Sequence, residues 1–504
     1  MTIHLSILLF FPLAFGLLAG FAPGRGAPVV LLAGTLVTLV YAVLLLLDFE
    51  TGAAGLQYVT DDAWIDEIGV RYTLGIDGLN LWLIALTALI SAAAALWLVV
   101  RPVVERPRLF AFHMGLAETA VLGAFLAQDL LLFVLFFDLM LVPFYFLVGQ
   151  WGGEGRVAAT FKMVVYTLVG SLLMLAAAVA TAMITGAGPD GATTFDIDAL
   201  AAAPMSEGTQ RWMFAAFALA FLIKMPSFPF HGWMPDAYRT MPLPALALFS
   251  GVLSKVAAYG FLRVALPVFP DAAEDFQTAI LILALLSIVY GSAQAFTQTN
   301  TRLILGYSSM AQLGFITLGV FALGEAAGAQ GALLQMVNHG LVVVPLFFII
   351  ALLHERTGSE DIREMGGVAF RAPVLGTLFL ITALATLAMP GSANFMGEFY
   401  ILLGLFNAKM AIAIIASIGV VLASVYMLRA FIRAMHNRVG ATVDSFDLRP
   451  RDGLVLVPLV CAIVAFGVYP QAALEDSATS TERVAAVAGG GGGGPETLAQ
   501  EATP

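Results

Sequence analysis

The sequence predicts an all-α polytopic membrane protein with roughly 14 transmembrane helices, because a helix needs about 20 largely apolar residues to span a bilayer. Three observations support this fold class. Apolar residues make up 60% of the 504-residue chain, and only 11% of its residues are charged. The apolar residues fall in long runs separated by short polar segments. These runs do not show the strict alternation that is typical of a membrane β-barrel.

The apolar runs give the expected helices in chain order. Each run is bounded by charged residues, glycine or proline, which are typical of loops and helix ends. The predicted spans are 3–20, 28–48, 78–100, 109–127, 129–150, 162–186, 210–230, 243–266, 275–296, 302–324, 330–353, 373–405, 409–435 and 453–472.

The loop charges predict how the chain crosses the membrane. Loops after odd-numbered spans are rich in Arg and Lys, for example Arg101, Arg106 and Arg108. Loops after even-numbered spans carry acidic clusters instead, such as Asp61 and Asp62. Because basic loops stay on the cytoplasmic side, both termini are expected outside. We therefore expect a multi-pass protein of the bacterial plasma (inner) membrane, with both ends on the periplasmic side.

Two spans contain a break at a similar place. The seventh contains KMPSFP at 224–229 and the twelfth contains MPGSAN at 389–394. Proline removes a backbone donor and clashes with the preceding turn, so each helix is expected to be discontinuous. Broken helices in corresponding halves are typical of inverted-repeat transporters. A proline kink without any site is the simpler alternative.

This pattern predicts five segments along the chain. Spans 4–8 and 9–13 are expected to form two inverted five-helix repeats. The expected segments are 1–108 (helices 1–3 with an acidic external loop), 109–266 (first repeat), 267–438 (second repeat), 439–472 (C-terminal helix) and 473–504 (a disordered, Gly-rich tail).

Ionisable and strongly polar residues recur inside the predicted spans. A lysine at the bilayer centre costs roughly 2.5–3.5 kcal/mol on insertion scales, so such residues usually face a protein interior or a water-filled path. The candidates for a proton relay are Asp138, Lys224, Lys255, His339 and Glu398, with Glu118, His231 and Gln312 as weaker candidates.

Several of these residues also have a structural explanation. Lys224 could reach an interface if its helix ended there, and His339 could be a satisfied core histidine. Glu118 could pair with an arginine or a backbone group. The series as a whole favours conduction of an ion, above all a proton, because its members recur through several spans.

A buried Asp138–Lys224 pair would form a natural switch. An apolar environment disfavours the charged form of either group, whereas an opposite charge within about 4–6 Å favours it. At 4 Å and an effective dielectric near 20, the attraction is about 4 kcal/mol. The lysine would hold its proton while the pair is closed and release it when the pair opens.

Other classes of function find no support in the sequence. Cys461 is the only cysteine, so a disulfide within the chain and an iron–sulfur cluster held by its own cysteines are excluded. No basic stripe indicates nucleic-acid binding, and no dinucleotide-binding fingerprint is present. No His pair or carboxylate cluster with metal-ligand spacing occurs. We therefore expect no metal and no cofactor in this chain.

Five segments resemble the antiporter-like subunits of respiratory complex I. They are residues 136–143 (FFDLMLVP), 224–236 (KMPSFPFHGWMPD), 251–255 (GVLSK), 338–341 (NHGL) and 389–399 (MPGSANFMGEF). The last segment is similar to the chain M (mitochondrial subunit 4) branch, whose last channel residue is a glutamate. The resemblance covers residues from about 75 to 435.

The resemblance implies a proton-translocating subunit of NADH:quinone oxidoreductase, driven by quinone reduction elsewhere. NADH, flavin, iron–sulfur clusters and quinone would belong to other subunits. Partners would be the lipid bilayer and other membrane-arm subunits, including neighbouring antiporter-like chains. By this likeness Asp138 and Lys224 are the switching pair, Lys255 is the central relay, His339 is a connector and Glu398 is the exit group.

Three positions depart from the family pattern. Asp138 replaces the usual glutamate, so a direct ion pair would lengthen or include a water. Gln312 replaces a frequent histidine and cannot carry a proton at neutral pH. Thr240 precedes Met241 and Pro242 where the family has Glu-Ala-Pro, which removes a carboxylate.

Two alternative functions remain open from the sequence. A subunit of a multi-subunit Na+/H+ antiporter would share the fold and the lysines but have no redox partner. Glu398 favours the complex I branch over this alternative. A purely structural helix bundle would bury about five ionisable groups, at a cost on the order of 10 kcal/mol with no gain.

Overall fold

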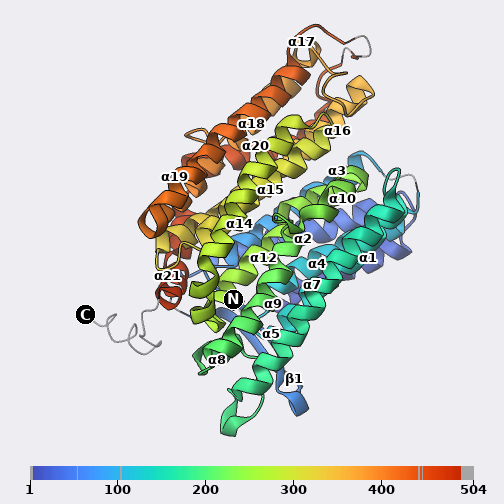
Figure 1. Ribbon diagram of the computed structural model, residues 1–504. Coiled ribbons are helices and arrows are strands. Elements are labelled where there is room, and N and C mark those ends of the chain that lie inside the picture. Colours follow the sequence, from blue (N-terminus) through green and yellow to red (C-terminus); the bar gives the residue numbers. More distant parts are fainter. Residues whose placement is uncertain (1–3, 54, 103–104, 441–442, 445, 490–504) are drawn as a thin grey trace.

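The predicted spans form helices that lie side by side in one bundle (Figure 1). The computed structural model describes residues 4–53, 55–102, 105–440, 443–444 and 446–489. Eleven helices in these ranges are long and apolar enough to cross a membrane. Two shorter apolar helices, Leu5–Phe21 and Pro373–Thr386, coincide with further predicted spans. The all-helical membrane fold is thereby confirmed, and the count of fourteen spans stays a prediction.

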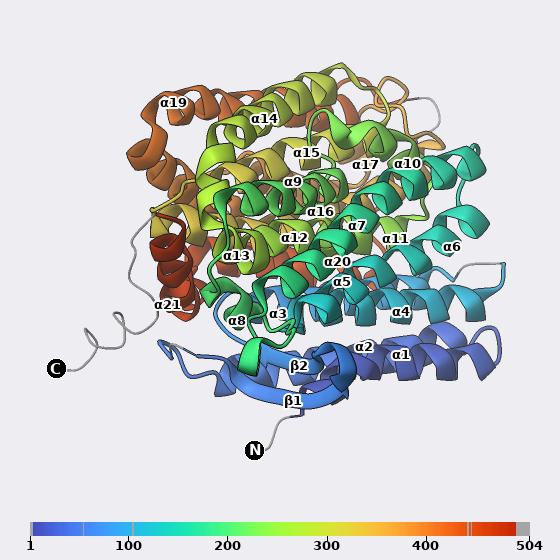
Figure 2. The same ribbon diagram turned by 60° about the horizontal axis from the view of Figure 1, so that its bottom comes forward.

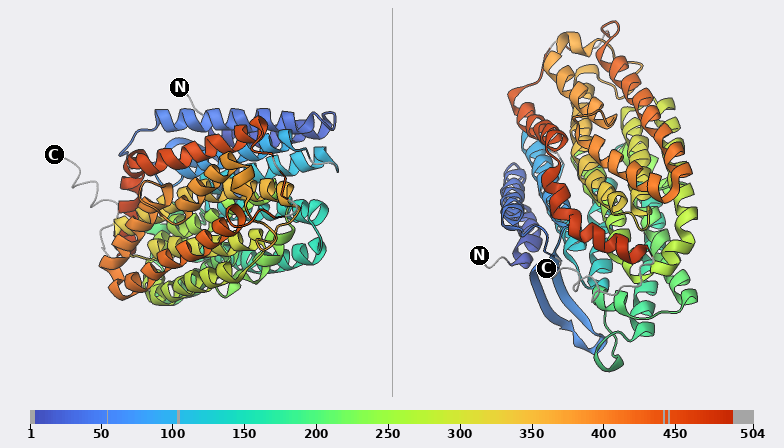
Figure 3. Two further views of the ribbon diagram at one scale, coloured as in Figure 1. Left: turned by 90° about the horizontal axis from the view of Figure 1, so that it is seen from above. Right: turned by 90° about the vertical axis from the view of Figure 1, so that its left-hand side faces the viewer.

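The N-terminal part consists of three helices and a hairpin. Its elements are α1 (Leu5–Phe21), α2 (Ala27–Asp48), β1 (Gln57–Ile65), the 3-10 turn η1 (Asp66–Ile68), β2 (Val70–Ile76) and α3 (Leu81–Val100). Figure 3 shows α1 and α2 along one side of the bundle. The antiparallel hairpin is an addition to the predicted fold. On it, a hydrogen bond from Arg71 holds the pKa of Asp61 below its usual range, so one carboxylate of this acidic loop is paired within the hairpin.

The first predicted repeat contains several interrupted helices. Its elements are α4 (Pro107–Leu126), α5 (Leu130–Leu139), α6 (Leu141–Trp151), α7 (Arg156–Thr185), η2 (Pro189–Gly191), α8 (Ile197–Ala202), α9 (Glu207–Lys224), η3 (Phe230–Trp233), α10 (Met234–Thr240), α11 (Leu243–Leu248), the π-helical η4 (Phe249–Leu253), α12 (Ser254–Gly260), the π-helical η5 (Phe261–Ala265) and α13 (Leu266–Val268).

The second predicted repeat has longer helices. Its elements are α14 (Pro270–Thr297), α15 (Thr301–Val320), α16 (Ala326–Thr357), α17 (Val368–Arg371), α18 (Pro373–Thr386) and α19 (Ala393–Met435). Lys409 has non-helical angles (φ −148°, ψ 73°), which divides α19 close to the predicted boundary between spans twelve and thirteen. The chain ends with α20 (Pro450–Val468) and α21 (Gln471–Ala488).

Both predicted breaks are present. Helix α9 ends at Lys224 and the chain resumes as η3 at Phe230, whereas α18 ends at Thr386 and α19 begins at Ala393. Each break contains a backbone hydrogen bond to the residue five positions earlier. The N–H of Ser227 donates to the carbonyl oxygen of Leu222 (3.0 Å), and the N–H of Met389 donates to that of Leu384 (3.3 Å). The two interruptions are therefore alike in local geometry as well as in sequence.

The second helix of each repeat begins in the same way. Asp129 caps α5 and Asn300 caps α15, each through a side-chain oxygen that accepts two backbone N–H groups. Each capping residue also forms an isolated bridge to the loop before the broken helix, Asp129 with Asp196 and Asn300 with Asp361. A hydrogen bond from Arg363 lowers the pKa of Asp361 to about 2, so this loop carboxylate is ionised at neutral pH.

These matching ends lie at opposite ends of the bundle. Figure 2 shows the hairpin, α8 and α21 at one end and α10 and α17 at the other. Asp196 lies directly before α8, and Asp361 lies shortly before α17. The arrangement fits two repeats of inverted orientation. The exact domain boundaries stay predictions.

The predicted disordered tail is wrong for its first part. Residues 471–488 form helix α21, which packs against α16, α13 and α14 through buried Leu474, Val484 and Ala485. The segment is rich in alanine, a strong helix former, and its few apolar side chains fall on one face. Residues 490–504, which hold most of the glycine run, lie outside the described part of the chain.

Candidate functional site

Lys224 ends helix α9 at the first break and is buried, with 3% of its surface exposed. Its Nζ atom donates a hydrogen bond of 3.0 Å to the carbonyl oxygen of Phe137 on α5. The same ammonium lies 4.5 Å from the centre of the Phe137 ring. Lys224 therefore does not extend to an interface, but is held in the interior beside α5.

Asp138 directly follows the residue that binds Lys224. Its side chain is partly buried, and its Oδ1 atom has no hydrogen-bond partner in the protein. Ser171 on α7 lies beside the carboxylate. No Asp138–Lys224 contact within 4.0 Å occurs among the ion pairs of the described residues. The structure thus brings the predicted pair together but leaves it unclosed, consistent with the short aspartate side chain.

A small cavity adjoins Lys224. Its volume is about 10 Å³, and its lining includes Thr167, Trp233, Phe249 and Leu253. This is close to the space needed for one water molecule. Phe249 and Leu253 belong to the π-helical segment η4, which leads into the helix that carries Lys255. The cavity therefore touches both Lys224 and the segment that leads to Lys255.

Lys255 is fully buried in α12 between the two π-helical segments. Its Nζ atom donates to the carbonyl oxygen of Ser250 at 2.5 Å and lies 3.3 Å from Ser254 Oγ. Ser250 also contacts Ser309 of α15 through its hydroxyl at 3.4 Å. Single π-helical turns widen a helix and occur frequently at functional sites. Here the bulge presents a carbonyl to the lysine and connects it to the second repeat.

His339 lies on α16 and is buried, with 3% of its surface exposed. Its Nδ1 atom has no hydrogen-bond partner in the protein, so the structure does not satisfy this ring as an ordinary core histidine. Lys255 is the charged group that acts on it electrostatically. The chain neighbours of His339 place it between η4 and the second broken helix, because Gly340 packs on the backbone of Gly251 and Asn338 donates to the carbonyl oxygen of Ala393.

Glu398 is the end of a directional hydrogen-bond chain in the second repeat. Gln335 donates from Nε2 to Gln312 Oε1 at 2.7 Å, and Gln312 donates from Nε2 to Glu398 Oε1 at 2.9 Å. All three side chains are buried. The structure thus gives Gln312 a definite position between α16 and α19, although an amide cannot itself carry a proton at neutral pH.

A group of unpaired polar atoms surrounds this chain. On α16, Gln335, Asn338 and His339 share one helical face, and each has a buried ring or amide atom without a protein partner. Asn338 donates to the carbonyl oxygen of Ala393 at 2.6 Å, which places it beside the first turn of α19. There both polar atoms of Asn394 are also unpaired. We call Gln335, Asn338, His339 and Asn394 the polar cage.

Close helix packing brings the polar cage together. A Cβ atom on Gly397 would lie 2.3 Å from Gln335 Oε1, and one on Gly404 would lie 2.4 Å from the backbone nitrogen of Gly328. Small residues at such a crossing allow two membrane helices to approach closely. The glycines therefore set the distance between α16 and α19, and with it the dimensions of the cage.

The two remaining weaker candidates differ in their surroundings. Glu118 on α4 is fully buried, and neither of its carboxylate oxygens has a protein partner, so the structural pairing considered from the sequence is absent. His231 is partly buried in η3 and its ring packs 4.9 Å from Tyr290. It lies close to the exposed Lys162–Asp236 ion pair at the α10 end of the bundle. The structure does not join Glu118 to the other candidates.

Sequence reasoning missed several polar residues of the site: Ser250, Ser254, Gln335, Asn338, Asn394 and Tyr426. Tyr426 bonds to Ser308 at 2.8 Å, one turn from Gln312 on α15. The available signal was the spacing of polar residues at 335, 338 and 339 within an apolar span, which places them on one helical face. Among the described residues, no group of three or more His, Cys, Asp or Glu side chains is placed to hold a metal ion.

Comparisons with known proteins agree with this fold. Residues 127–424 match the family model described as NADH:quinone oxidoreductase/Mrp antiporter, TM. The chain is 35% identical over 484 residues to NADH-quinone oxidoreductase subunit M of Rhodobacter capsulatus, which covers 92% of this chain and 93% of that protein.

Solved structures give the same picture. A chain of respiratory complex I from Thermus thermophilus with bound NADH superposes with a TM-score of 0.89 at 32% identity, covering 97% of this chain and 100% of that one. A chain of the Mrp complex from a Dietzia species has a TM-score of 0.82 at 23% identity, covering 96% and 99%. The second likeness concerns the fold alone.

Proposed function

This chain belongs to the subunit M branch of the antiporter-like membrane subunits of NADH:quinone oxidoreductase, and on that basis we propose that it translocates protons as one subunit of this complex. The single observation that carries the proposal is the series of buried ionisable side chains in and beside the two broken helices. Lys224 lies at the first break, and Glu398 lies in the first turns after the second. Such residues are expensive within a membrane and mark ion paths.

The proposed relay begins at Asp138 and Lys224. In the present arrangement the ammonium is held by the Phe137 carbonyl rather than by the carboxylate. A shift of one side chain would close the ion pair and favour the charged lysine, and the opposite shift would favour release of its proton. The adjacent cavity touches both Lys224 and the segment that leads to Lys255, which supports transfer in that direction.

Lys255 and His339 then pass the proton into the second repeat. Lysine and histidine can both accept and release a proton, whereas the serine hydroxyl groups and the Ser250 carbonyl orient the lysine. His339 has an unpaired ring nitrogen on the far side of this step. The order Lys255, His339, Glu398 follows the order of the helices across the bundle.

The step to Glu398 needs a route around Gln312. The amide chain from Gln335 to Glu398 is oriented toward the carboxylate and cannot relay a proton. The polar cage offers several buried donors and acceptors beside it. Because buried polar groups are normally satisfied by protein or by water, we propose that water bound in the cage carries the proton past Gln312.

The proposal assigns the redox chemistry to other chains. NADH, flavin, iron–sulfur clusters and quinone are expected in other subunits of the complex, and this chain acts through coupling along the membrane arm. Its neighbours would be other membrane-arm subunits, including further antiporter-like chains, and the surrounding lipid. By the positive-inside rule, the hairpin, α8 and α21 face the periplasm and both termini lie outside.

A second candidate function is a subunit of a multi-subunit Na+/H+ antiporter. The family model includes Mrp antiporters, and the fold agreement with a Mrp chain supports this alternative. The higher identity to subunit M and the glutamate at 398 favour the complex I function. Under the antiporter alternative, ion transport would need no quinone reduction.

The test is Lys255→Met in the whole complex reconstituted into vesicles. Because methionine keeps most of the volume but cannot carry a proton, NADH-driven acidification and NADH:quinone activity should both fall. Lys409→Met is the matched control, since Lys409 is exposed at the kink in α19. The proposal is wrong if Lys255→Met pumps as well as Lys409→Met in an assembled complex.

A further inference from the structure

The helix that carries Lys255 has two more polar residues on the same face. Tyr259 and Arg263 follow Lys255 at intervals of four residues, and Arg263 lies beside Asp77, in the loop between β2 and α3 that α21 covers. The proposed relay uses neither residue. They stand between Lys255 and the outer surface.

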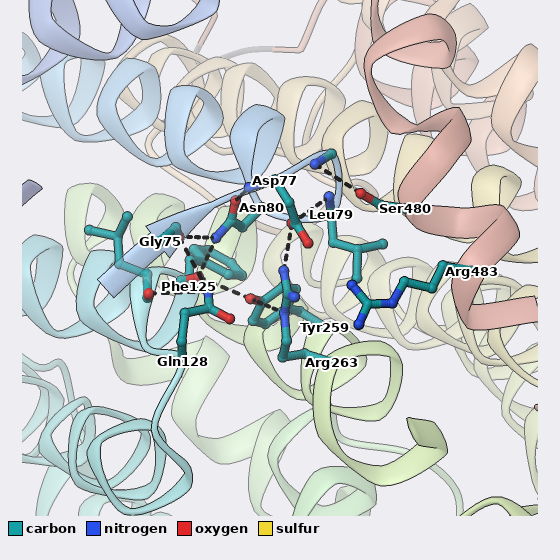
Figure 4. A network of polar contacts seen from close by, with 12 residues as sticks. Gly75, Asp77, Leu79, Asn80, Phe125, Gln128, Tyr259, Arg263, Ser480 and Arg483 are labelled. Atoms are coloured by element: carbon teal, nitrogen blue, oxygen red, sulfur yellow. Dashed lines mark hydrogen bonds and ion pairs between the residues drawn. The ribbon is translucent and has the colours of Figure 1, made fainter. Parts of the chain in front are cut away.

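Arg263 forms a buried ion pair with Asp77. Its Nη2 atom lies 2.5 Å from Asp77 Oδ1, and the two side chains are only 10% and 14% exposed. Arg263 also donates from Nε to the Tyr259 hydroxyl at 2.9 Å, and that hydroxyl donates to the carbonyl oxygen of Phe125 at 3.0 Å. Figure 4 shows Arg263 between Tyr259 and Asp77.

The directions of these hydrogen bonds block proton transfer. A guanidinium group has no acceptor and stays protonated at any physiological pH. The only proton of Tyr259 points to a backbone carbonyl, which passes no proton onward. A proton on Lys255 therefore finds no hydrogen-bonded route through Tyr259 and Arg263 to Asp77.

The loop that carries Asp77 is held firmly in place. Asp77 Oδ1 also accepts from the backbone N–H of Leu79 at 2.9 Å, and Asn80 donates to the carbonyl oxygens of Gly75 and Phe125. From outside, Ser480 of α21 accepts from the backbone N–H of Gly78 at 3.1 Å (Figure 4). A Cβ atom on Gly78 would lie 2.3 Å from the backbone oxygen of Asp476, so α21 packs directly over this loop.

A buried ion pair is a weak source of stability, because desolvation offsets most of its attraction. A charged pair at the outer end of an apolar helix therefore suggests a role other than stability. A relay that releases protons beyond Glu398 works only if Lys255 is not also open to the outer water. Otherwise, protons would return down the gradient through the first repeat.

We propose that Arg263, Asp77 and Tyr259 form a seal that closes the outer end of the first repeat. With the seal in place, a proton on Lys255 can leave only sideways, toward His339 and the second repeat. The seal deepens the proposed function and rests on it. Arg263 and Asp77 are positioning residues in this scheme, and they carry no proton themselves.

The test measures passive proton leak through the whole complex in vesicles without NADH. A potassium diffusion potential set by valinomycin drives protons inward, and a pH-sensitive dye inside the vesicles reports them. Arg263→Gln keeps a similar shape but removes the charge, and it should raise the leak about tenfold, which corresponds to a barrier lower by about 1.4 kcal/mol. Arg211→Gln is the matched control, since Arg211 belongs to an exposed ion pair with Asp275 at the same end.

A second set of variants locates the leak. Asp77→Asn should leak as Arg263→Gln does, and it tests the seal independently if the arginine variant does not assemble. Adding Lys255→Met to Arg263→Gln should return the leak to the control level, because the path starts at Lys255. A purely structural role would not produce a leak that depends on Lys255.

The seal is refuted if the leak of both Arg263→Gln and Asp77→Asn equals that of Arg211→Gln, or if the leak persists in the double variant. This failure differs from failure of the proposed function. If Lys255→Met alone still pumps with NADH, the relay is wrong. If Lys255→Met does not pump and neither seal variant leaks, only the seal is wrong.

Discussion

At the scale of single residues, Asp138 decides whether the first step works as a switch. It replaces the glutamate of the family pattern, and its Oδ1 atom has no hydrogen-bond partner in the protein, while the adjacent Phe137 carbonyl binds Lys224. The sequence predicted an Asp138–Lys224 pair, and the structure holds the two residues near one another without an ion-pair contact. The sequence could not predict their distance, which depends on how α5 and α9 pack.

We expect Asp138→Asn to lower NADH-driven proton pumping and quinone reduction by about 100-fold or to background, the lower end of the effect of a positioned proton-transfer group. Asp138→Glu is the matched variant and should keep activity, because it retains the charge and extends the side chain toward Lys224. Equal activity of the Asn and Glu variants, measured in membranes with equal amounts of complex, would contradict a role for the negative charge.

A second prediction at the scale of single residues concerns Gln312. Gln312→Leu removes its bonds to Gln335 and Glu398, and each buried polar group left unpaired costs about 1–3 kcal/mol. We expect a lower melting temperature of the purified complex and slower pumping. Gln312→His, which can titrate, should pump at least as well as the unchanged protein. If Gln312→Leu has the melting temperature and the pumping rate of the unchanged protein, the amide chain does not organise Glu398.

At the scale of elements, the two broken helices were predicted from the sequence and are present in the structure. The prolines at 226 and 390 fix the breaks because they act locally. The polar cage could not be predicted in this way. Its residues come from α16 and α19, and only their close crossing makes a site of side chains that look ordinary in each helix.

Helix α21 was mistaken for a tail because its composition is polar and it is followed by six glycines. Its order comes from contacts with distant segments. Asp476 accepts from Trp82 at 3.1 Å and from Thr51 at 2.6 Å, and Gln330 donates to the carbonyl oxygen of Leu474 at 2.7 Å. Such long-range contacts leave no local signal in the sequence.

A further prediction concerns the close crossing of α16 and α19. Gly397→Ala introduces a methyl group 2.3 Å from Gln335 Oε1, so α16 and α19 must separate or the amide must move. Overpacking of this kind costs about 1–3 kcal/mol, and we expect a lower melting temperature of the complex together with reduced pumping. Gly20→Ala is the control, because nothing lies within 4 Å of its Cβ position. Equal melting temperatures for the two variants would show that the crossing is not tight.

At the scale of the whole molecule, the inverted repeats place two similar half-structures on opposite sides of the bundle. The capping residues Asp129 and Asn300 begin equivalent helices and bridge to equivalent loops. The two proline-containing breaks predicted this arrangement, because they recur at corresponding places in the two halves of the sequence. The direction of the chain in the membrane rests on loop charges alone and stays a prediction.

The hairpin end should face the periplasm. In a Cys461→Ser background, Asp190→Cys should react with a membrane-impermeant maleimide added to intact cells, since position 190 is exposed near α8. Glu154→Cys, exposed between α6 and α7 at the other end, should react only after the membrane is opened. The reverse labelling pattern would contradict the orientation and place the proposed exit on the wrong side.

Proton pumping and NADH:quinone activity in membranes that carry Lys224→Ala decide whether the relay runs through this chain. The lysine lies at the first break with no interface within its reach, so removing it should interrupt the proton path at its start. We predict that both activities fall together while the complex still assembles. Pumping and quinone reduction at unchanged levels would mean that Lys224 is structural and that the relay does not run through this chain.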